Sequence, residues 1–131
     1  MLKALKAVGA KKVSFVTPYL DEVTERGRVF LEQHGFNVVS SRGLNIKSDP
    51  GIGAVTTQRT YDFALETVKP EADAVFISCT NFRTIGAIQP LEEKLKKPVV
   101  SSIQASFWEC LKLAGTVPTS EVKGFGRLFQ A

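Results

Sequence analysis

Short runs of apolar and β-branched residues alternate along the chain with longer stretches in which apolar side chains recur every three or four positions. The first pattern is typical of buried strands, and the second is typical of amphipathic helices. The predicted strands cover residues 12–17, 36–40, 73–79 and 98–101. The predicted helices cover residues 2–8, 21–34, 56–69, 84–97 and 102–114.

This alternation of strand and helix predicts a parallel sheet with right-handed crossovers and helices on both faces. We therefore expect an α/β fold: three α/β/α layers around a four-stranded parallel sheet. A chain of 131 residues is long enough for one real core but short for a two-domain enzyme. The expected organisation is a single α/β domain over residues 1–131.

Helical spacing also predicts which side chains are buried. Cys110, inside the last helix, is expected to be buried as a small hydrophobic residue. His34 is expected to end the first long helix, where it favours the helix dipole without a catalytic role. The expected apolar face of that helix consists of Val23, Gly27, Phe30 and Leu31.

Two segments are less regular. Residues 42–54 are rich in Gly, Ser, Asp and Pro and are predicted to form an irregular loop, a kind of segment that is often functional. Pro90 fits best in the first turn of a helix, which predicts a short turn at residues 85–88 before the main helix.

Composition narrows the functional classes. Seventeen Lys and Arg against thirteen Asp and Glu give a net charge of +4, but these residues are scattered, so no nucleic-acid partner is expected. No apolar run reaches transmembrane length, so no membrane association is expected. Two cysteines without a secretory segment predict a reducing cytoplasm. Their spacing, with a single His, does not predict a metal site.

The most informative polar residues directly follow the strand at 73–79. Ligands of open α/β sheets gather at the carboxyl ends of strands, and Cys79 stands at such an end. The dipole of the following helix and nearby N–H groups favour the thiolate, which is the reactive form. The alternative is that Cys79 is only a small packing residue. Its polar neighbours Ser78, Thr80 and Asn81 argue against that alternative, because packing positions seldom need them.

Polar clusters at other strand ends are expected to meet Cys79 at the same edge: Thr17-Pro18-Tyr19, Ser78 to Asn81, and Ser101-Ser102. Their hydroxyl and N–H groups suit a carboxylate or the enolate formed from one. The candidate substrate-binding residues are therefore Thr17, Ser78, Thr80 and Asn81.

Two residues carry the candidate catalysis. Cys79 as a thiolate can remove an α-proton or add to an activated double bond, and as a thiol it can protonate a carbanion. The Tyr19 phenol can donate to the developing oxyanion, or it simply packs over its loop. None of these steps requires a metal or an organic cofactor.

These stretches resemble a known family. Together they are similar to the maleate isomerase and arylmalonate decarboxylase branch of the aspartate/glutamate racemase superfamily, over nearly the whole chain. The motifs that carry the resemblance are Thr17-Pro18-Tyr19, Ser78-Cys79-Thr80-Asn81-Phe82-Arg83-Thr84, Pro98-Val99-Val100-Ser101-Ser102-Ile103-Gln104-Ala105 with Trp108, and Gly124-Phe125-Gly126-Arg127-Leu128.

The resemblance implies a cofactor-independent enzyme with two similar flavodoxin-like α/β halves and an active site between them. It implies that Cys79 is the catalytic cysteine of the second half and that Tyr19 binds a carboxylate or enolate. Thr80 and Asn81 would belong to the anion-binding turn. The implied substrate is a small dicarboxylate such as maleate or an arylmalonate.

The chain matches only the second half of that architecture. The first-half motif with its own cysteine is absent, and Cys110 cannot replace it from a helix. Ser48-Asp49-Pro50 and Ile103 stand where the family tends to carry Asn. The chain is therefore expected to work with a first-half partner or as a homo-oligomer.

Two functional hypotheses remain open at this point. The first is an isomerase or decarboxylase that acts through Cys79. The second is a catalytically incomplete half-domain that serves as a binding or structural module and self-associates. A flavodoxin-like signalling or nucleotide-binding role is disfavoured, because no acidic cluster or G-x-G-x-x-G loop accompanies the first strand.

Overall fold

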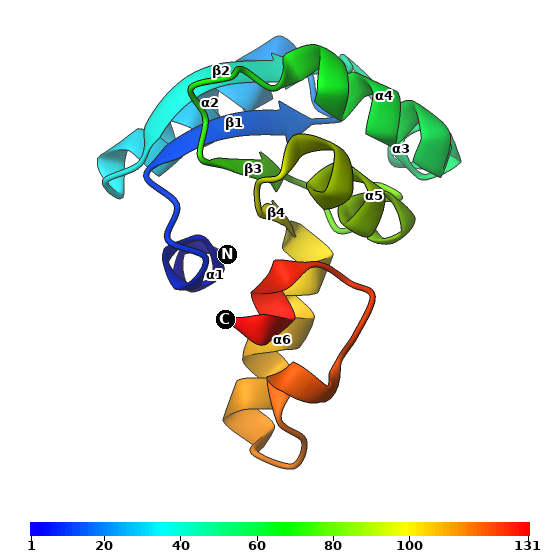
Figure 1. Cartoon of the computed structure of the whole chain (residues 1–131). Coiled ribbons are helices and arrows are strands. Elements are labelled where there is room, and N and C mark those ends of the chain that lie inside the picture. The colour runs from blue at the N-terminus through cyan, green and yellow to red at the C-terminus, as the bar shows by residue number, and fades with distance from the viewer.

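Four parallel strands form the central sheet, in the order β2-β1-β3-β4. The computed structural model describes residues 1–131 (Figure 1). The strands are β1 (Lys12–Thr17), β2 (Asn37–Gly43), β3 (Ala74–Ile77) and β4 (Val99–Ser101). The α-helices are α1 (Leu2–Ala7), α2 (Asp21–Gln33), α3 (Asp49–Ala54), α4 (Thr57–Thr67), α5 (Ile85–Leu95) and α6 (Ser102–Ala114). Two 3₁₀ turns, η1 (Thr119–Glu121) and η2 (Arg127–Gln130), follow.

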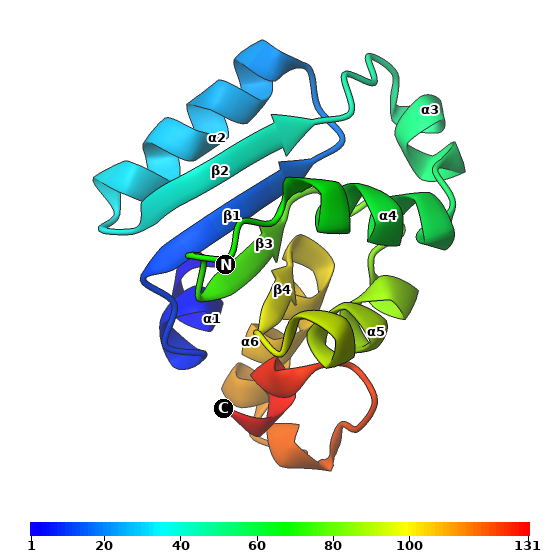
Figure 2. The same ribbon diagram turned by 45° about the horizontal axis from the view of Figure 1, so that its top comes forward.

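Alternation of side chains along the strands divides the core into two layers. Val13 and Phe15 of β1 face a cluster that includes residues of α1, α2, α6 and the C-terminal segment. Val16 faces a second cluster with α3, α4 and α5. Figure 2 shows α4 and α5 side by side over that second face. The expected three-layer α/β/α arrangement with a four-stranded parallel sheet is therefore confirmed.

Part of the predicted irregular segment at 42–54 is regular. β2 extends to Gly43, and α3 covers Asp49–Ala54. Ser48 begins this helix, because its Oγ accepts a hydrogen bond from the N–H of Gly51 at 3.2 Å. Pro50 lies in the first turn, where its missing N–H has no cost. The prediction overlooked these start signals because the glycines obscured the helical pattern.

The predicted break before Pro90 is wrong, because α5 runs through it without interruption. Proline inside a helix removes one N–H···O bond. Ala87, Ile88 and Leu91, on both sides of Pro90, are all buried in the α4–α5 layer. Burial of that continuous apolar face offsets the missing bond.

The predicted orientation of α2 is wrong in part. Val23 and Phe30 are 39% and 43% exposed, whereas Thr24 and Leu31 are buried. The face that packs on the sheet is therefore rotated, and Phe30 instead lies against the ring of His34, with centroids 4.2 Å apart. His34 forms the C-cap of this helix as expected.

Cys110 is exposed on α6, which contradicts its predicted burial. The buried side of α6 is formed by Gln104, Ala105 and Trp108. Cys110 lies two positions after Trp108, which turns it away from the core by the helical repeat of 3.6 residues.

The buried carboxylate of Glu92 connects the C-terminal segment to β4 through hydrogen bonds to backbone N–H groups of both. Glu92 of α5 is only 4% exposed. Its Oε1 accepts the N–H of Val99 at 2.8 Å, and its Oε2 accepts the N–H of Arg127 at 2.9 Å. Burial raises the pKa of Glu92, while these backbone donors oppose that rise.

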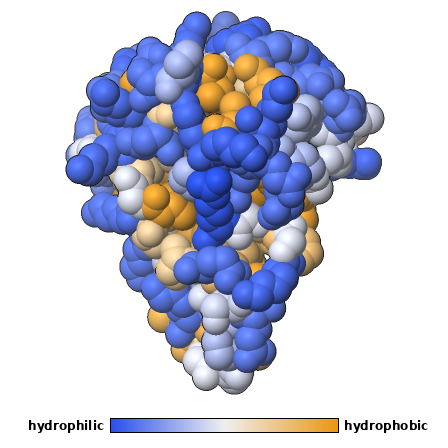
Figure 3. Space-filling model, viewed as in Figure 1, coloured by the Kyte–Doolittle hydropathy of each residue, from blue (hydrophilic) through white to orange (hydrophobic).

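The surface in Figure 3 is mainly hydrophilic, with apolar side chains in separate patches. No helix has the length and apolar character needed to span a bilayer.

Candidate functional site

The carboxyl ends of β1, β3 and β4 meet at one edge of the sheet. The Tyr19 hydroxyl, after β1, lies 3.2 Å from the Ser78 Oγ, after β3. The N–H of Cys79 donates to the Ser102 Oγ, after β4, at 3.1 Å. The three polar clusters expected to converge therefore do so, because the sheet order places β3 between β1 and β4.

Cys79 adopts an unusual backbone conformation, with φ at 91°. A residue with a Cβ is strained in this left-handed region, and such strain often accompanies functional sites. The hydrogen bond to Ser102 stabilises the Cys79 N–H, and the side chain is half-buried. The thiol is therefore held at the sheet edge by local geometry, although a glycine would fit the backbone better.

Tyr19 is held in place by its loop. Its N–H donates to the Thr17 Oγ1 at 3.2 Å, and its carbonyl accepts the N–H of Asn45 at 3.0 Å. Gly43 packs closely below, since a Cβ on it would lie 2.3 Å from the Tyr19 carbonyl oxygen. These contacts aim the phenol towards Ser78.

The environment keeps the Tyr19 phenol protonated. Burial is the main cause that raises its pKa, and the nearby Cys79 and Asp49 side chains raise it further. The hydrogen bond with Ser78 acts in the opposite direction. A phenol with a raised pKa is a neutral hydrogen-bond donor at neutral pH, which suits an oxyanion acceptor.

The predicted substrate-binding residues differ in their exposure to solvent. Thr17 is fully buried and its Oγ1 lies 2.6 Å from the Thr24 Oγ1, so its side chain supports Tyr19 from below the surface. Ser78 is half-buried, whereas Thr80 and Asn81 are exposed. The Asn81 amide donates to the Asp49 carbonyl at 2.9 Å, which ties this loop to α3.

The helix predicted from residue 102 has Ser101 as its N-cap, in a capping box with Gln104. Ser102 is thereby free to accept the Cys79 N–H. The sequence signal that could have predicted this contact is the position of Ser102 directly after β4, the strand next to β3. Arg83 was not singled out as a functional candidate, although it lies in the loop that carries Cys79.

The edge combines a thiol, a phenol and hydroxyl groups. No group of three or more His, Cys, Asp and Glu side chains is arranged to hold a metal ion. A thiol can act as a proton donor, a base or a nucleophile, and the phenol and hydroxyls can donate to an oxyanion.

The fold and the site define a class of protein: a parallel α/β domain that carries a cysteine after its third strand, near a tyrosine from the loop after its first strand. Comparison with known proteins makes the class specific. The family described as arylmalonate decarboxylase matches residues 1–129. The chain belongs to the arylmalonate decarboxylase family.

Individual relatives agree with this membership. The chain is 34% identical to the arylmalonate decarboxylase of Bordetella bronchiseptica over 131 residues, which cover 98% of this chain and 54% of the relative. It is 28% identical to the maleate isomerase of Alcaligenes faecalis, over 88% of this chain and 46% of the relative. The chain thus spans about half the length of these relatives.

Solved structures show the same correspondence. Unliganded arylmalonate decarboxylase superposes with a TM-score of 0.86 at 33% identity, over 98% of this chain and 55% of that one. A Nocardia farcinica maleate cis-trans isomerase variant with a covalently bound succinylcysteine intermediate superposes with a TM-score of 0.92 at 25% identity, over 98% of this chain and 52% of that one. The fold is therefore that of about half of each relative.

Proposed function

We propose that this chain supplies the Cys79 side of an active site that isomerises or decarboxylates a small dicarboxylate without a cofactor. The observation that carries this proposal is the juxtaposition of the Cys79 loop with the hydrogen-bonded Tyr19–Ser78 pair at one sheet edge. Membership of a family that contains decarboxylases and isomerases supports it.

Decarboxylation uses the Cys79 thiol as an acid. The bond between the α-carbon and one carboxylate breaks, CO₂ leaves, and the electron pair forms an enediolate with the remaining carboxylate. Tyr19 and Ser78 donate hydrogen bonds to its oxygens. The Cys79 S–H then protonates the α-carbon, and the resulting thiolate regains a proton from water.

Isomerisation uses the Cys79 thiolate as a nucleophile. The sulfur adds to one alkene carbon of maleate, and the π electrons move to the other carbon and its carboxylate. Rotation about the new single bond and loss of the thiolate restore a double bond in the trans configuration. The succinylcysteine intermediate described for the cysteine-to-serine variant of the Nocardia farcinica relative is the protonated form of such an adduct, and it shows that a cysteine of that relative other than the replaced one adds to the substrate.

The test replaces each reacting group separately. Cys79→Ser is expected to lower turnover of maleate or phenylmalonate by about 100-fold or more. Tyr19→Phe is expected to lower it about 100-fold through the lost oxyanion donor. Cys110→Ala is the matched control, because Cys110 is exposed on α6. Turnover that is unchanged in Cys79→Ser would remove Cys79 from the mechanism.

The assay distinguishes the two reactions. CO₂ release from phenylmalonate reports decarboxylation, whereas fumarate formation and a succinyl adduct on Cys79, detected by mass spectrometry, report isomerisation.

A second candidate function is that of an incomplete half-domain that binds another chain. A groove of about 300 Å³ supports this candidate, because six of its seven lining residues are hydrophobic. Ile85, Ile103, Phe107 and Phe125, in this groove, are between 37% and 53% exposed. Exposed apolar groups of this kind favour association. Sedimentation at micromolar concentration that shows only a monomer, together with turnover by that monomer, would exclude this candidate.

A further inference from the structure

A pocket of about 350 Å³ begins directly beside the Cys79 loop and extends between the first turns of α4 and α5. Thr80, next in the chain after Cys79, lines one part of it, and Thr57 and Gly86 line another. The two helices approach closely, since a Cβ on Gly86 would lie 3.1 Å from the Thr57 Cγ2. The pocket therefore connects the proposed reaction site with two helix N-termini.

Both helix ends contribute positive potential. α4 and α5 have 11 residues each, long enough for a helix dipole. The first-turn N–H groups of Ile85 and Gly86 have no acceptor within the chain. Free N–H groups and the positive end of a dipole together favour an anion.

A buried hydroxyl gives independent evidence for a ligand. Thr84, the N-cap residue of α5, lines the pocket and is fully buried. Its Oγ1 makes no hydrogen bond in the protein, in contrast to the cap residues of α3, α4 and α6. Buried polar atoms without a partner are rare, and a group bound in the pocket would supply the Thr84 hydroxyl with one.

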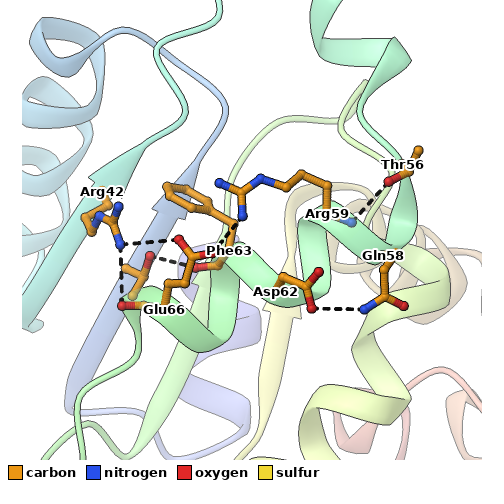
Figure 4. Close-up of polar contacts among 8 residues, drawn as sticks. Arg42, Thr56, Gln58, Arg59, Asp62, Phe63 and Glu66 are labelled. Atoms are coloured by element: carbon orange, nitrogen blue, oxygen red, sulfur yellow. Dashed lines mark hydrogen bonds and ion pairs between the residues drawn. The ribbon is translucent and has the colours of Figure 1, made fainter.

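The pocket also holds an uncompensated cation. Arg83 lines it and forms neither an ion pair nor a hydrogen bond, and no Asp or Glu lines the pocket. The neighbouring arginines differ, because Arg59 contacts Glu66 at 2.7 Å and Arg42 contacts the same carboxylate at 3.8 Å (Figure 4). Both also lie over the Phe63 ring. The guanidinium of Arg83 is therefore available to a ligand.

We propose that this pocket binds the distal carboxylate of a maleate-like substrate and that Arg83 determines the preference for such a dicarboxylate. This inference rests on the proposed function, since it places the reacting carbon at Cys79. The guanidinium forms two parallel hydrogen bonds with the carboxylate, and the α5 N–H groups and the Thr84 hydroxyl complete its shell.

The experiment compares two unreactive ligands of equal chain length, succinate and butyrate, by NMR titration of backbone amides. Wild-type protein is expected to bind succinate about tenfold more tightly than butyrate, with the largest shifts at Ile85 and Gly86. That ratio corresponds to about 1.4 kcal/mol. Arg83→Met is expected to remove the preference by weakening succinate alone.

Arg26→Met is the matched control, because Arg26 is also exposed and unpaired but lies on α2. It changes the net charge equally and is expected to keep the preference for succinate. The inference is overturned if Arg83→Met keeps the preference, if Arg26→Met loses it to the same extent, or if the Ile85 and Gly86 amides do not shift.

Binding by Cys79→Ser separates this inference from the proposed function. That variant is expected to retain the tenfold preference although it loses turnover. A wild-type protein without turnover that still prefers succinate through Arg83 would contradict only the proposed reaction. Turnover without any effect of Arg83→Met on succinate binding would contradict only the role of the pocket.

Discussion

Replacement of Glu92 by Ala is expected to destabilise the protein strongly, because it removes the acceptor of two backbone N–H groups. The N–H of Val99 is buried in the sheet layer, and that of Arg127 is partly buried. A buried donor without a partner costs about 1–3 kcal/mol. With a smaller cost at Arg127, the expected loss of unfolding free energy is about 2–4 kcal/mol.

Glu92→Gln gives an intermediate case. One amide oxygen can still accept the Val99 N–H, but the amide nitrogen faces the Arg127 N–H, donor against donor. The expected loss is about 1–2 kcal/mol. Glu93→Ala is the control, because Glu93 is exposed and bonds only to Gln89 on the surface; its expected effect is below about 0.5 kcal/mol.

Urea denaturation followed by far-UV circular dichroism measures these differences. An Ala variant at position 92 within 0.5 kcal/mol of wild type, or as stable as Glu93→Ala, would refute the anchoring role. A loss confined to residues 116–131 in hydrogen exchange would show that only the C-terminal segment is released.

The difference in stability between wild type and Glu92→Gln is expected to change with pH in a defined direction. The pKa of Glu92 is raised in the folded state, mainly by burial. The folded protein therefore binds more protons than the unfolded chain between the unfolded pKa of about 4.3 and the raised folded value. As pH rises through that window, wild type loses stability relative to Glu92→Gln, which does not titrate. A gap that does not change with pH would contradict the raised pKa.

Two further predictions concern the candidate site. Cys79→Gly is expected to be about 1 kcal/mol more stable than Cys79→Ala, because φ of 91° strains any Cβ; equal melting curves would contradict the strain. Gly43→Ala is expected to destabilise the protein by about 2 kcal/mol or more and to shift the Tyr19 resonances, because its Cβ would meet the Tyr19 carbonyl oxygen at 2.3 Å. A stable variant with unshifted resonances would show that the loop can adjust.

Local patterns predicted most of the framework. The strand at Lys12–Thr17 has the expected bounds, and Ala74–Ile77 lies inside its predicted run. The position of Cys79 at the carboxyl end of a strand follows from that run and the polar residues after it. The errors came where local signals compete, as at Pro90, or where the buried side of a helix is set by its partner, as at Phe30 and Cys110.

The sequence by itself determined the parallel α/β fold and the strand-end location of the cysteine. Both follow from periodicities of two and 3.6 residues and from chain-local turn signals. Only the tertiary structure decided that Ser102 accepts the Cys79 N–H. The same holds for the position of Arg83, which lies unpaired near the adjacent first turns of α4 and α5. These contacts join residues from different strands and helices. Their formation depends on strand order and helix packing, which are properties of the whole chain.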